Sequence, residues 1–297
     1  MTIETWRQAL PHGITLSCRA AGQRGRPVLM FLHGFPEAAF VWDELLEHFA
    51  QEANGGYRCV APNLRGYEES SQPAEVAAYR PKFLVQDIAA LARSEGAPLA
   101  GLVAHDWGGA VAWNLANQQP ELLQKLAIVN SPHPGTFLRA LQHSEAQQAA
   151  SAYMNFLVRP DAEVLLRTQD HARLFGFFAH GKPAAWLTEA LKARYRAVWD
   201  RSLTGGLNYY RASPLRPARG EDPGASTLTL PRGMLTVDVP TLVLWGLQDA
   251  ALLPELLEGL EEYVPRLSVE KVADASHWIV HEQPQQVAQR LAAFLRS

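Results

Sequence analysis

The chain has 297 residues, with 27 Lys and Arg against 30 Asp and Glu, a formal net charge of −3 and 47% hydrophobic residues. This balance is that of an ordinary globular protein and excludes a disordered, collagen-like or coiled-coil chain. Because there is no basic excess, we expect no binding to nucleic acid or to an anionic membrane. At roughly 150 residues per domain, the length predicts two domains or one large α/β unit with an insertion.

Neither the cysteines nor the amino terminus indicates an exported or membrane protein. Cys18 and Cys59 are too few for a disulfide framework and lack metal-ligand spacing, so we expect two reduced, buried thiols. The first residues lack a basic segment followed by an apolar one, and the apolar runs are far shorter than the ~20 residues of a membrane-spanning helix. We therefore expect a soluble, cytoplasmic protein.

Short apolar strands alternate with amphipathic helices along the first part of the chain. Such alternation predicts a mainly parallel, doubly wound sheet. The predicted strands cover residues 5–9, 14–20, 28–32, 58–61, 99–104 and 126–129, and the predicted helices cover 40–49, 82–94 and 108–117.

The pattern changes after residue 134. Residues 135–233 show helical periodicity and almost no strand pattern, and they close with a loop rich in Pro and Gly over 214–233. Strand and helix patterns then alternate again. We therefore predict an α/β core of residues 1–134 and 234–297, interrupted by an all-helical cap over 135–233. The late strands are expected over 240–245 and 267–272, and the late helices over 254–263 and 284–295.

The most informative segment is His105-Asp106-Trp107-Gly108-Gly109, which joins an apolar strand directly to a helix. Small residues at Ala104 and Gly108 predict the sharp strand-to-helix turn of a nucleophile elbow. The residue at its centre is Asp106 rather than Ser. A carboxylate there would attack a saturated, electrophilic carbon and form an alkyl ester, which water then hydrolyses. The alternative interpretation is that Asp106 only caps the following helix.

A general base and its orienting acid are expected later in the chain, in the order nucleophile, acid, histidine. Asp249 follows the strand that ends near Trp245, and His277 follows the strand over 267–272. Order and strand-end position make them the candidate acid and base. In related enzymes the acid can also stand at the end of the strand after the elbow. Asn130 occupies that position here, and an uncharged amide cannot stabilise an imidazolium. His105, His133 and His281 are interpreted as loop-orienting or surface histidines.

A backbone oxyanion site is predicted beside the elbow. His33-Gly34-Phe35-Pro36-Glu37 follows the strand over 28–32. In this fold a backbone N–H of that loop pairs with the one after the nucleophile, so Phe35 and Trp107 are the expected main-chain donors. The alternative is a turn without a catalytic part.

Together these segments resemble α/β-hydrolase-fold epoxide hydrolases over nearly the whole chain. The resemblance implies the α/β-hydrolase fold with a helical cap, a small-molecule epoxide and water as reactants, and no metal or organic cofactor. It leaves the oligomeric state open between monomer and homodimer. The matching residues are His33-Gly34-Phe35-Pro36-Glu37, Arg65-Gly66-Tyr67, His105-Asp106-Trp107-Gly108-Gly109, Asn130-Ser131-Pro132-His133-Pro134 and the segments around Asp249 and His277.

The resemblance also implies two cap tyrosines that donate hydrogen bonds to the epoxide oxygen. The segments around Tyr153 and Tyr210 match the family's two tyrosine segments, with Tyr209 as a neighbour that stays open. A phenol with a pKa of about 10 suits donation at neutral pH. The alternative is that both are core aromatics. The residues expected around the substrate are His33, Phe35, Pro36, Trp107 and Trp278.

Three other functions share parts of this pattern. A haloalkane dehalogenase would use the same Asp-Trp step, but it commonly has Asn where this chain has Phe35. A haloacetate dehalogenase usually has Arg after the nucleophile and a His-Trp pair in the cap, where this chain has Trp107 and Tyr153-Met154. A hydrolase fold kept as a binding module need not retain the nucleophile, acid and base together. We therefore favour hydrolysis of a largely neutral, apolar epoxide.

Overall fold

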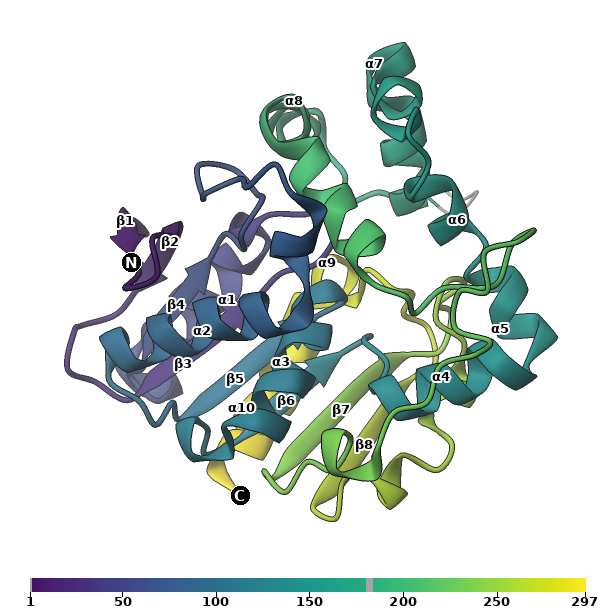
Figure 1. The fold of residues 1–297 in the computed structure, drawn as a ribbon. Helices are drawn as coiled ribbons and strands as arrows, with labels where there is room; N and C mark the ends of the chain where they lie inside the picture. The colour runs from purple at the N-terminus through teal and green to yellow at the C-terminus, as the bar shows by residue number, and fades with distance from the viewer. Residues whose placement is uncertain (1, 180–183) are drawn as a thin grey trace.

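A computed structural model of the chain describes residues 2–179 and 184–297 (Figure 1). Within these ranges the strands form one eight-stranded sheet in the order β1-β2-β4-β3-β5-β6-β7-β8. The pairs from β4 to β8 are parallel, whereas β1 and β2 add an antiparallel edge. The strands are β1 (Glu4–Ala9), β2 (Thr15–Ala21), β3 (Val28–Leu32), β4 (Arg58–Pro62), β5 (Gly101–His105), β6 (Leu126–Val129), β7 (Thr241–Gly246) and β8 (Leu267–Val272).

Helices cover both faces of the sheet. Apolar residues of α2 (Pro81–Glu95) and α3 (Trp107–Gln118) belong to the cluster on one face, and those of α1 (Asp43–Ala50) and α10 (Pro284–Arg296) to the cluster on the other. The middle strands β3 to β7 are consequently buried along their whole length. A parallel strand covered on both faces requires a continuous apolar run rather than an alternating one. The predicted doubly wound sheet is confirmed.

Much of the chain between β6 and β7 is helical, and in Figure 1 it lies partly above the sheet and partly beside β7 and β8. This segment includes residues 135–233, for which the sequence predicts a cap. That these residues form a domain distinct from the core stays a prediction. Residues 180–183 of that cap lie outside the described residues. Among residues 2–179 and 184–297, no helix is long and apolar enough to cross a membrane. The helices of the segment are α4 (Pro134–His143), α5 (Glu145–Ala150), α6 (Tyr153–Leu157), α7 (Ala162–Ala179) and α8 (Glu189–Ala212).

Three local features complete the core. The predicted helix over 254–263 is wrong: two short 3₁₀ turns, Pro254–Leu257 and Leu260–Glu262, occupy this stretch. Gly259 between them has a left-handed φ of +71°, which interrupts an α-helix. The short helix α9 (Ile279–Glu282) follows the loop after β8. Cys18 and Cys59 are free and buried, as predicted.

Helix α8 touches the core at a point where there is no room for a side chain. A Cβ on Gly205 would lie 2.1 Å from the carbonyl oxygen of Gly66, in the loop after β4. Two backbones meet there directly. This contact positions the last turns of α8, which carry Tyr209 and Tyr210.

We expect Gly205→Ala to destabilise the fold by about 2 kcal/mol or more, because backbone rather than a flexible side chain must move. Gly176→Ala in α7 is the matched control, since no atom of a neighbouring described residue lies within 4 Å of its added Cβ. That change should raise the free energy of unfolding by about 0.5–1 kcal/mol through higher helix propensity. Urea denaturation of both variants measures the difference, and equal stabilities would contradict the close contact.

Candidate active site

Asp106 stands at the turn between β5 and α3 in a strained backbone conformation. Its φ is +50° and its ψ is −122°, a combination that residues with a side chain rarely adopt. Neighbouring glycines make the turn possible. A Cβ on Gly34 would lie 2.3 Å from the Cβ of Asp106, and one on Gly108 would lie 2.5 Å from the carbonyl oxygen of Leu32. The predicted strand-to-helix elbow is thus present, and it lifts the Asp106 side chain above the end of the sheet.

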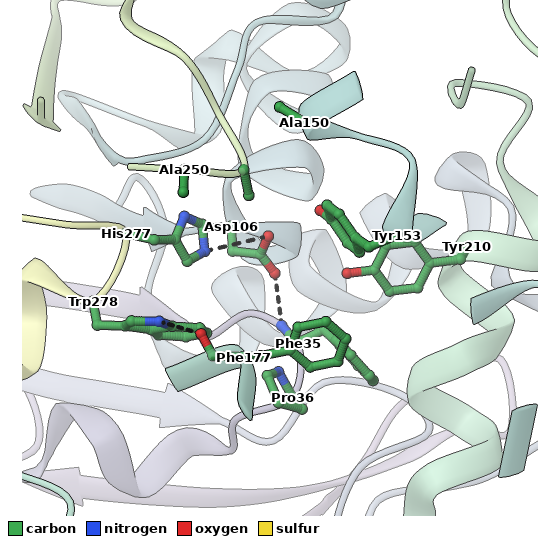
Figure 2. A pocket seen from close by; sticks show the side chains of 11 residues that line it. Phe35, Pro36, Asp106, Ala150, Tyr153, Phe177, Tyr210, Ala250, His277 and Trp278 are labelled. Atoms are coloured by element: carbon green, nitrogen blue, oxygen red, sulfur yellow. Dashed lines mark hydrogen bonds and ion pairs between the residues drawn. The ribbon is translucent and has the colours of Figure 1, made fainter. Parts of the chain in front are cut away.

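The two carboxylate oxygens of Asp106 face different groups (Figure 2). The backbone N–H of Phe35 donates to Oδ1 at 2.7 Å. Nε2 of His277 lies 3.8 Å from Oδ2. The hydroxyl of Ser131 donates to the backbone carbonyl of Asp106 at 2.7 Å and so ties the turn to the end of β6.

His277 and Asp249 lie in direct contact. Nδ1 of His277 is 2.7 Å from Oδ2 of Asp249. The backbone N–H groups of Ala251 and Leu252 both donate to Oδ1 of Asp249 at 2.9 Å. The side-chain amide of Asn130 donates to Oδ2 at 2.8 Å. Asn130 cannot serve as the acid itself, but it stabilises Asp249 by this hydrogen bond. Sequence reasoning missed this role.

Contact between the two residues lowers the pKa of Asp249 and raises the pKa of His277. Burial alone would raise the pKa of Asp249, but the adjacent His277 and the hydrogen bonds from Leu252 and Asn130 outweigh it and lower that pKa. Burial would lower the pKa of His277, but the charge of Asp249 and the hydrogen bond to it, with a contribution from Asp106, raise it to about 9. Asp249 is thus held ionised beside a histidine that favours protonation while Asp106 carries its charge.

Two tyrosine hydroxyls point toward Asp106 from the helical segment (Figure 2). Tyr153 comes from α6 and Tyr210 from α8, and their ring centroids lie 6.2 Å apart. Burial raises the pKa of both phenols, and the negative charge of Asp106 adds to the effect, so both remain protonated donors. Tyr209 faces away, because its hydroxyl donates to the carbonyl of Arg65 at 2.8 Å. The rotation of α8 therefore turns Tyr210, and not Tyr209, toward the cavity that Asp106 lines.

Asp106, His277 and the two tyrosines, Tyr153 and Tyr210, line a cavity of about 240 Å³. Its lining is mostly apolar, and Phe177 of α7 is a member that the sequence did not reveal. Beyond Asp106 and Tyr153 lies a second cavity of about 410 Å³, to which Trp107 contributes. Among the described residues, no group of three His, Cys, Asp or Glu side chains could hold a metal ion. The first cavity is lined by Phe35, Pro36, Asp106, Ala150, Tyr153, Phe177, Tyr210, Ala250, Ala251, His277 and Trp278.

The sequence predicts that His33 lies next to the substrate, but the structure places it away from both cavities. It is fully buried and does not line either cavity. Its Nδ1 pairs with the carbonyl of Gly34 at 2.9 Å, and its Nε2 accepts from the backbone N–H of Leu64 at 3.1 Å. Burial lowers the pKa of His33 to about 4, so the ring is neutral and holds two loops together.

Comparison with known proteins places this geometry in a family. The family model described as alpha/beta hydrolase fold matches residues 27–284. The chain belongs to the α/β-hydrolase fold family. It is 34% identical to "AB hydrolase superfamily protein YfhM" of Bacillus subtilis (strain 168), over 96% of each chain.

Named relatives and solved structures of this family include epoxide hydrolases. The chain is 34% identical to "Epoxide hydrolase 4" of Mus musculus, over 96% of this chain and 77% of the mouse protein. A solved structure described as "Novel epoxide hydrolases belonging to the alpha/beta hydrolases superfamily in metagenomes from hot environments" matches with a TM-score of 0.88 and 37% identity, over 99% of each chain. The predicted resemblance to α/β-hydrolase-fold epoxide hydrolases is confirmed.

The raised pKa of His277 makes folding stability depend on pH. Its folded pKa of about 9 exceeds the ordinary value of 6.5, so its contribution is full below about pH 6.5 and is lost as the pH rises through 9. We compare wild type with His277→Gln by their free energies of unfolding. The excess of wild type over the variant should be larger at pH 6 than at pH 10 by on the order of 1–3 kcal/mol. Urea denaturation across this range measures the difference, and a difference that does not change with pH would contradict the shift.

Proposed function

We propose that this chain is an epoxide hydrolase that converts a largely neutral, apolar epoxide to a vicinal diol. The observation that carries the proposal is the convergence of Asp106, His277, Tyr153 and Tyr210 on one cavity. A carboxylate suits attack on a saturated carbon, and two phenols suit an oxygen that gains negative charge. The epoxide hydrolases among its relatives and structural neighbours support the same reaction class.

In the first step, an oxygen of Asp106 attacks a carbon of the epoxide ring. A carbon–oxygen ester bond forms while the ring carbon–oxygen bond breaks, and the freed oxygen takes the electron pair. Tyr153 and Tyr210 donate hydrogen bonds to that developing alkoxide, and one of the phenols transfers its proton to the alkoxide. The orientation of both hydroxyls toward Asp106 supports this role.

In the second step, water attacks the carbonyl carbon of the Asp106 ester. His277, oriented by Asp249 at 2.7 Å, accepts a proton from the water. The tetrahedral oxyanion is stabilised by the backbone N–H groups of Phe35 and Trp107. The 2.7 Å bond from Phe35 to Oδ1 supports the assignment of the first donor. The bond to the product oxygen then breaks, and that oxygen takes the proton from His277 to complete the diol. The other hydrogen of the water leaves Asp106, which returns to its carboxylate form, and restores the phenol that gave up its proton in the first step.

Forming the ester also prepares His277 for its task. The charge of Asp106 is one of the causes that raise the pKa of His277 toward 9. When Asp106 becomes a neutral ester, this contribution disappears and the pKa of His277 falls. The base therefore becomes available after the nucleophile has reacted.

The cavity favours an apolar substrate over a small anion. Aromatic rings of Phe35, Phe177 and Trp278 form much of its wall, and no Lys or Arg among the described residues lines it. A haloalkane dehalogenase remains the alternative with the same nucleophile. The second cavity beyond Trp107 gives a substrate more room than a short haloalkane needs.

The test of the proposal is a substrate panel that measures diol formation, halide release and ester cleavage. We expect wild type to form diols, and Asp106→Ala to form none. His277→Gln should form the ester but hydrolyse it about 100-fold more slowly or worse, because general-base assistance is lost. Intact-protein mass spectrometry should then show an added mass of one epoxide. Halide release without diol formation would favour the dehalogenase, and turnover by Asp106→Ala would contradict the nucleophile.

The two phenols are tested by removing only their hydroxyls. The Tyr153→Phe/Tyr210→Phe double variant should slow ring opening about 100-fold or more, since no donor remains for the alkoxide. Tyr209→Phe is the matched control, because that hydroxyl is bonded to Arg65 instead of facing the cavity. Single-turnover alkylation rates measure the effect. A normal rate in the double variant would remove the case for epoxides.

A further inference from the structure

The loop that carries Asp249 is held by a side chain from the helical segment. This loop, residues 249–253, follows β7 in the core, and we call it the acid loop. Gln147 lies in α5, 104 positions before Ala251 of that loop, and its side chain is fully buried. Burying an amide is costly unless its donors and its acceptor are bonded, so its partners indicate what it supports.

The amide of Gln147 bonds to the backbone of the acid loop through both its nitrogen and its oxygen. Its Nε2 donates to the carbonyl oxygen of Ala251 at 2.8 Å, and its Oε1 accepts from the backbone N–H of Leu253 at 3.0 Å. Nε2 also donates to the hydroxyl of Ser151 at 2.8 Å. Turned over, the amide would set an N–H against the N–H of Leu253 and an oxygen against the carbonyl of Ala251. The partners of the side chain therefore fix its orientation.

Helix α5 is itself fixed against the same stretch of chain. The hydroxyl of Ser144, the N-cap of α5, accepts from the backbone N–H of Gln147 at 3.1 Å and donates to Oε1 of Glu255 at 2.6 Å. Glu255 lies in the 3₁₀ turn that follows the acid loop. Gln147 therefore reaches the loop from a helix whose first turn is bonded to the chain just after that loop.

One peptide group of the acid loop contacts both Gln147 and Asp249. The carbonyl of Ala251 and the N–H of Leu252 belong to the same planar peptide group and point in opposite directions. The carbonyl accepts from Gln147, and the N–H donates to Oδ1 of Asp249 at 2.9 Å. Holding the carbonyl therefore sets the direction of the N–H. A hydrogen bond to the carbonyl also polarises the peptide group and strengthens the bond that its N–H makes.

We propose that Gln147 is a positioning residue that aims a backbone N–H of the acid loop at Asp249 and thereby orients His277. Oδ2 of the same carboxylate lies 2.7 Å from Nδ1 of His277, so a rotation of Asp249 would turn the imidazole away from Asp106. The bond from Leu252 is also one of the causes that keep the pKa of Asp249 low. The kinetic part of this inference rests on the proposed function, whereas the placement of Asp249 does not.

Replacing Gln147 removes the hydrogen bonds that hold the acid loop on this side. Among the described residues, the carbonyl of Ala251 and the N–H of Leu253 have no other hydrogen-bond partner. Gln147→Met keeps an unbranched side chain of similar length but removes its donor and acceptor. Unpaired backbone groups are costly to bury, so the loop must move to find new partners. We therefore expect the acid loop to shift in this variant, and Asp249 to shift with it.

The placement of the carboxylate is tested by the ¹H NMR signal of the proton between Nδ1 of His277 and Asp249 in the full chain. A proton in a short bond to a carboxylate resonates far downfield, and His277→Gln identifies the signal by removing it. In Gln147→Met the signal should move upfield or disappear, because the bond lengthens. Gln148→Met is the matched control on the same helix and should leave the signal in place, because the Gln148 amide donates to the carbonyl of Leu141 instead. An unchanged signal in folded Gln147→Met would overturn the proposal.

The effect on catalysis is tested by single-turnover kinetics with an epoxide that wild type converts. Gln147→Met should slow hydrolysis of the Asp106 ester about 10- to 100-fold, the effect of a misplaced base, while alkylation stays within about threefold. Gln148→Met should keep both rates within about twofold of wild type. Ala150 of α5 and Ala250 of the acid loop line the cavity (Figure 2), so general damage to this wall would slow both steps. An equal loss in both steps would mean that Gln147 only supports the fold, against the proposal.

Two further variants separate the bonds to the acid loop from the packing of α5. Gln147→Asn keeps an amide that is one methylene shorter and cannot span the same two backbone groups, so it should show the same selective loss even if the Met variant does not fold. Ser151→Ala removes only the other partner of Nε2, and both rates should stay near those of wild type. Normal hydrolysis in Gln147→Asn, or a loss in Ser151→Ala as large as in the Gln147 variants, would refute the inference. If wild type forms no ester from any epoxide, the proposed function fails, while the NMR signal still decides whether Gln147 places Asp249.

Discussion

The backbone turn at Asp106 is the constraint on which the rest of the site depends. A residue with a side chain is held at a φ of +50° because the strand β5 must pass directly into α3. The turn fits only where Gly34 and Gly108 leave their space empty. Parallel pairing of β3 with β5 brings the loop after Leu32 beside Ala104 and thus against the elbow. One constraint therefore exposes the carboxylate and supplies the N–H of Phe35 to it.

The polar groups beneath the elbow can be buried because each one has several partners. Asp249 accepts from two backbone N–H groups, from Asn130 and from His277. A carboxylate with this set of donors remains ionised in the protein interior and can hold an imidazole in one orientation. The same rule applies to Glu37, whose donors come from three other elements.

The helical segment adds the parts that the core lacks. Its tyrosines approach Asp106 from the side opposite His277 in Figure 2, and Phe177 supplies an apolar wall. The direct contact between Gly205 and Gly66 fixes the distance of α8 from the core. Because that contact lies five residues before Tyr210 in the chain, backbone packing and the placement of the phenol are coupled. In the proposed mechanism, this coupling aligns the alkoxide donor with the nucleophile.

Local features of the sequence were enough to predict the parallel sheet, the elbow and the order of Asp106, Asp249 and His277. These depend on apolar runs, on small residues beside a turn and on chain order, all of which are local. Local periodicity was insufficient at 254–263, where a left-handed Gly259 splits an apparent helix into two turns.

Which side chains meet depends on the folded arrangement of distant segments. Tyr209 and Tyr210 are neighbours in the chain, and the rotation of α8 turns one toward Arg65 and the other toward the cavity. His105 contacts Glu37 and His277, which are 68 and 172 positions away in the chain, so no local pattern could reveal its pairing. A residue's neighbours along the chain set its backbone, but the partners of a buried side chain depend on the segments that folding places around it.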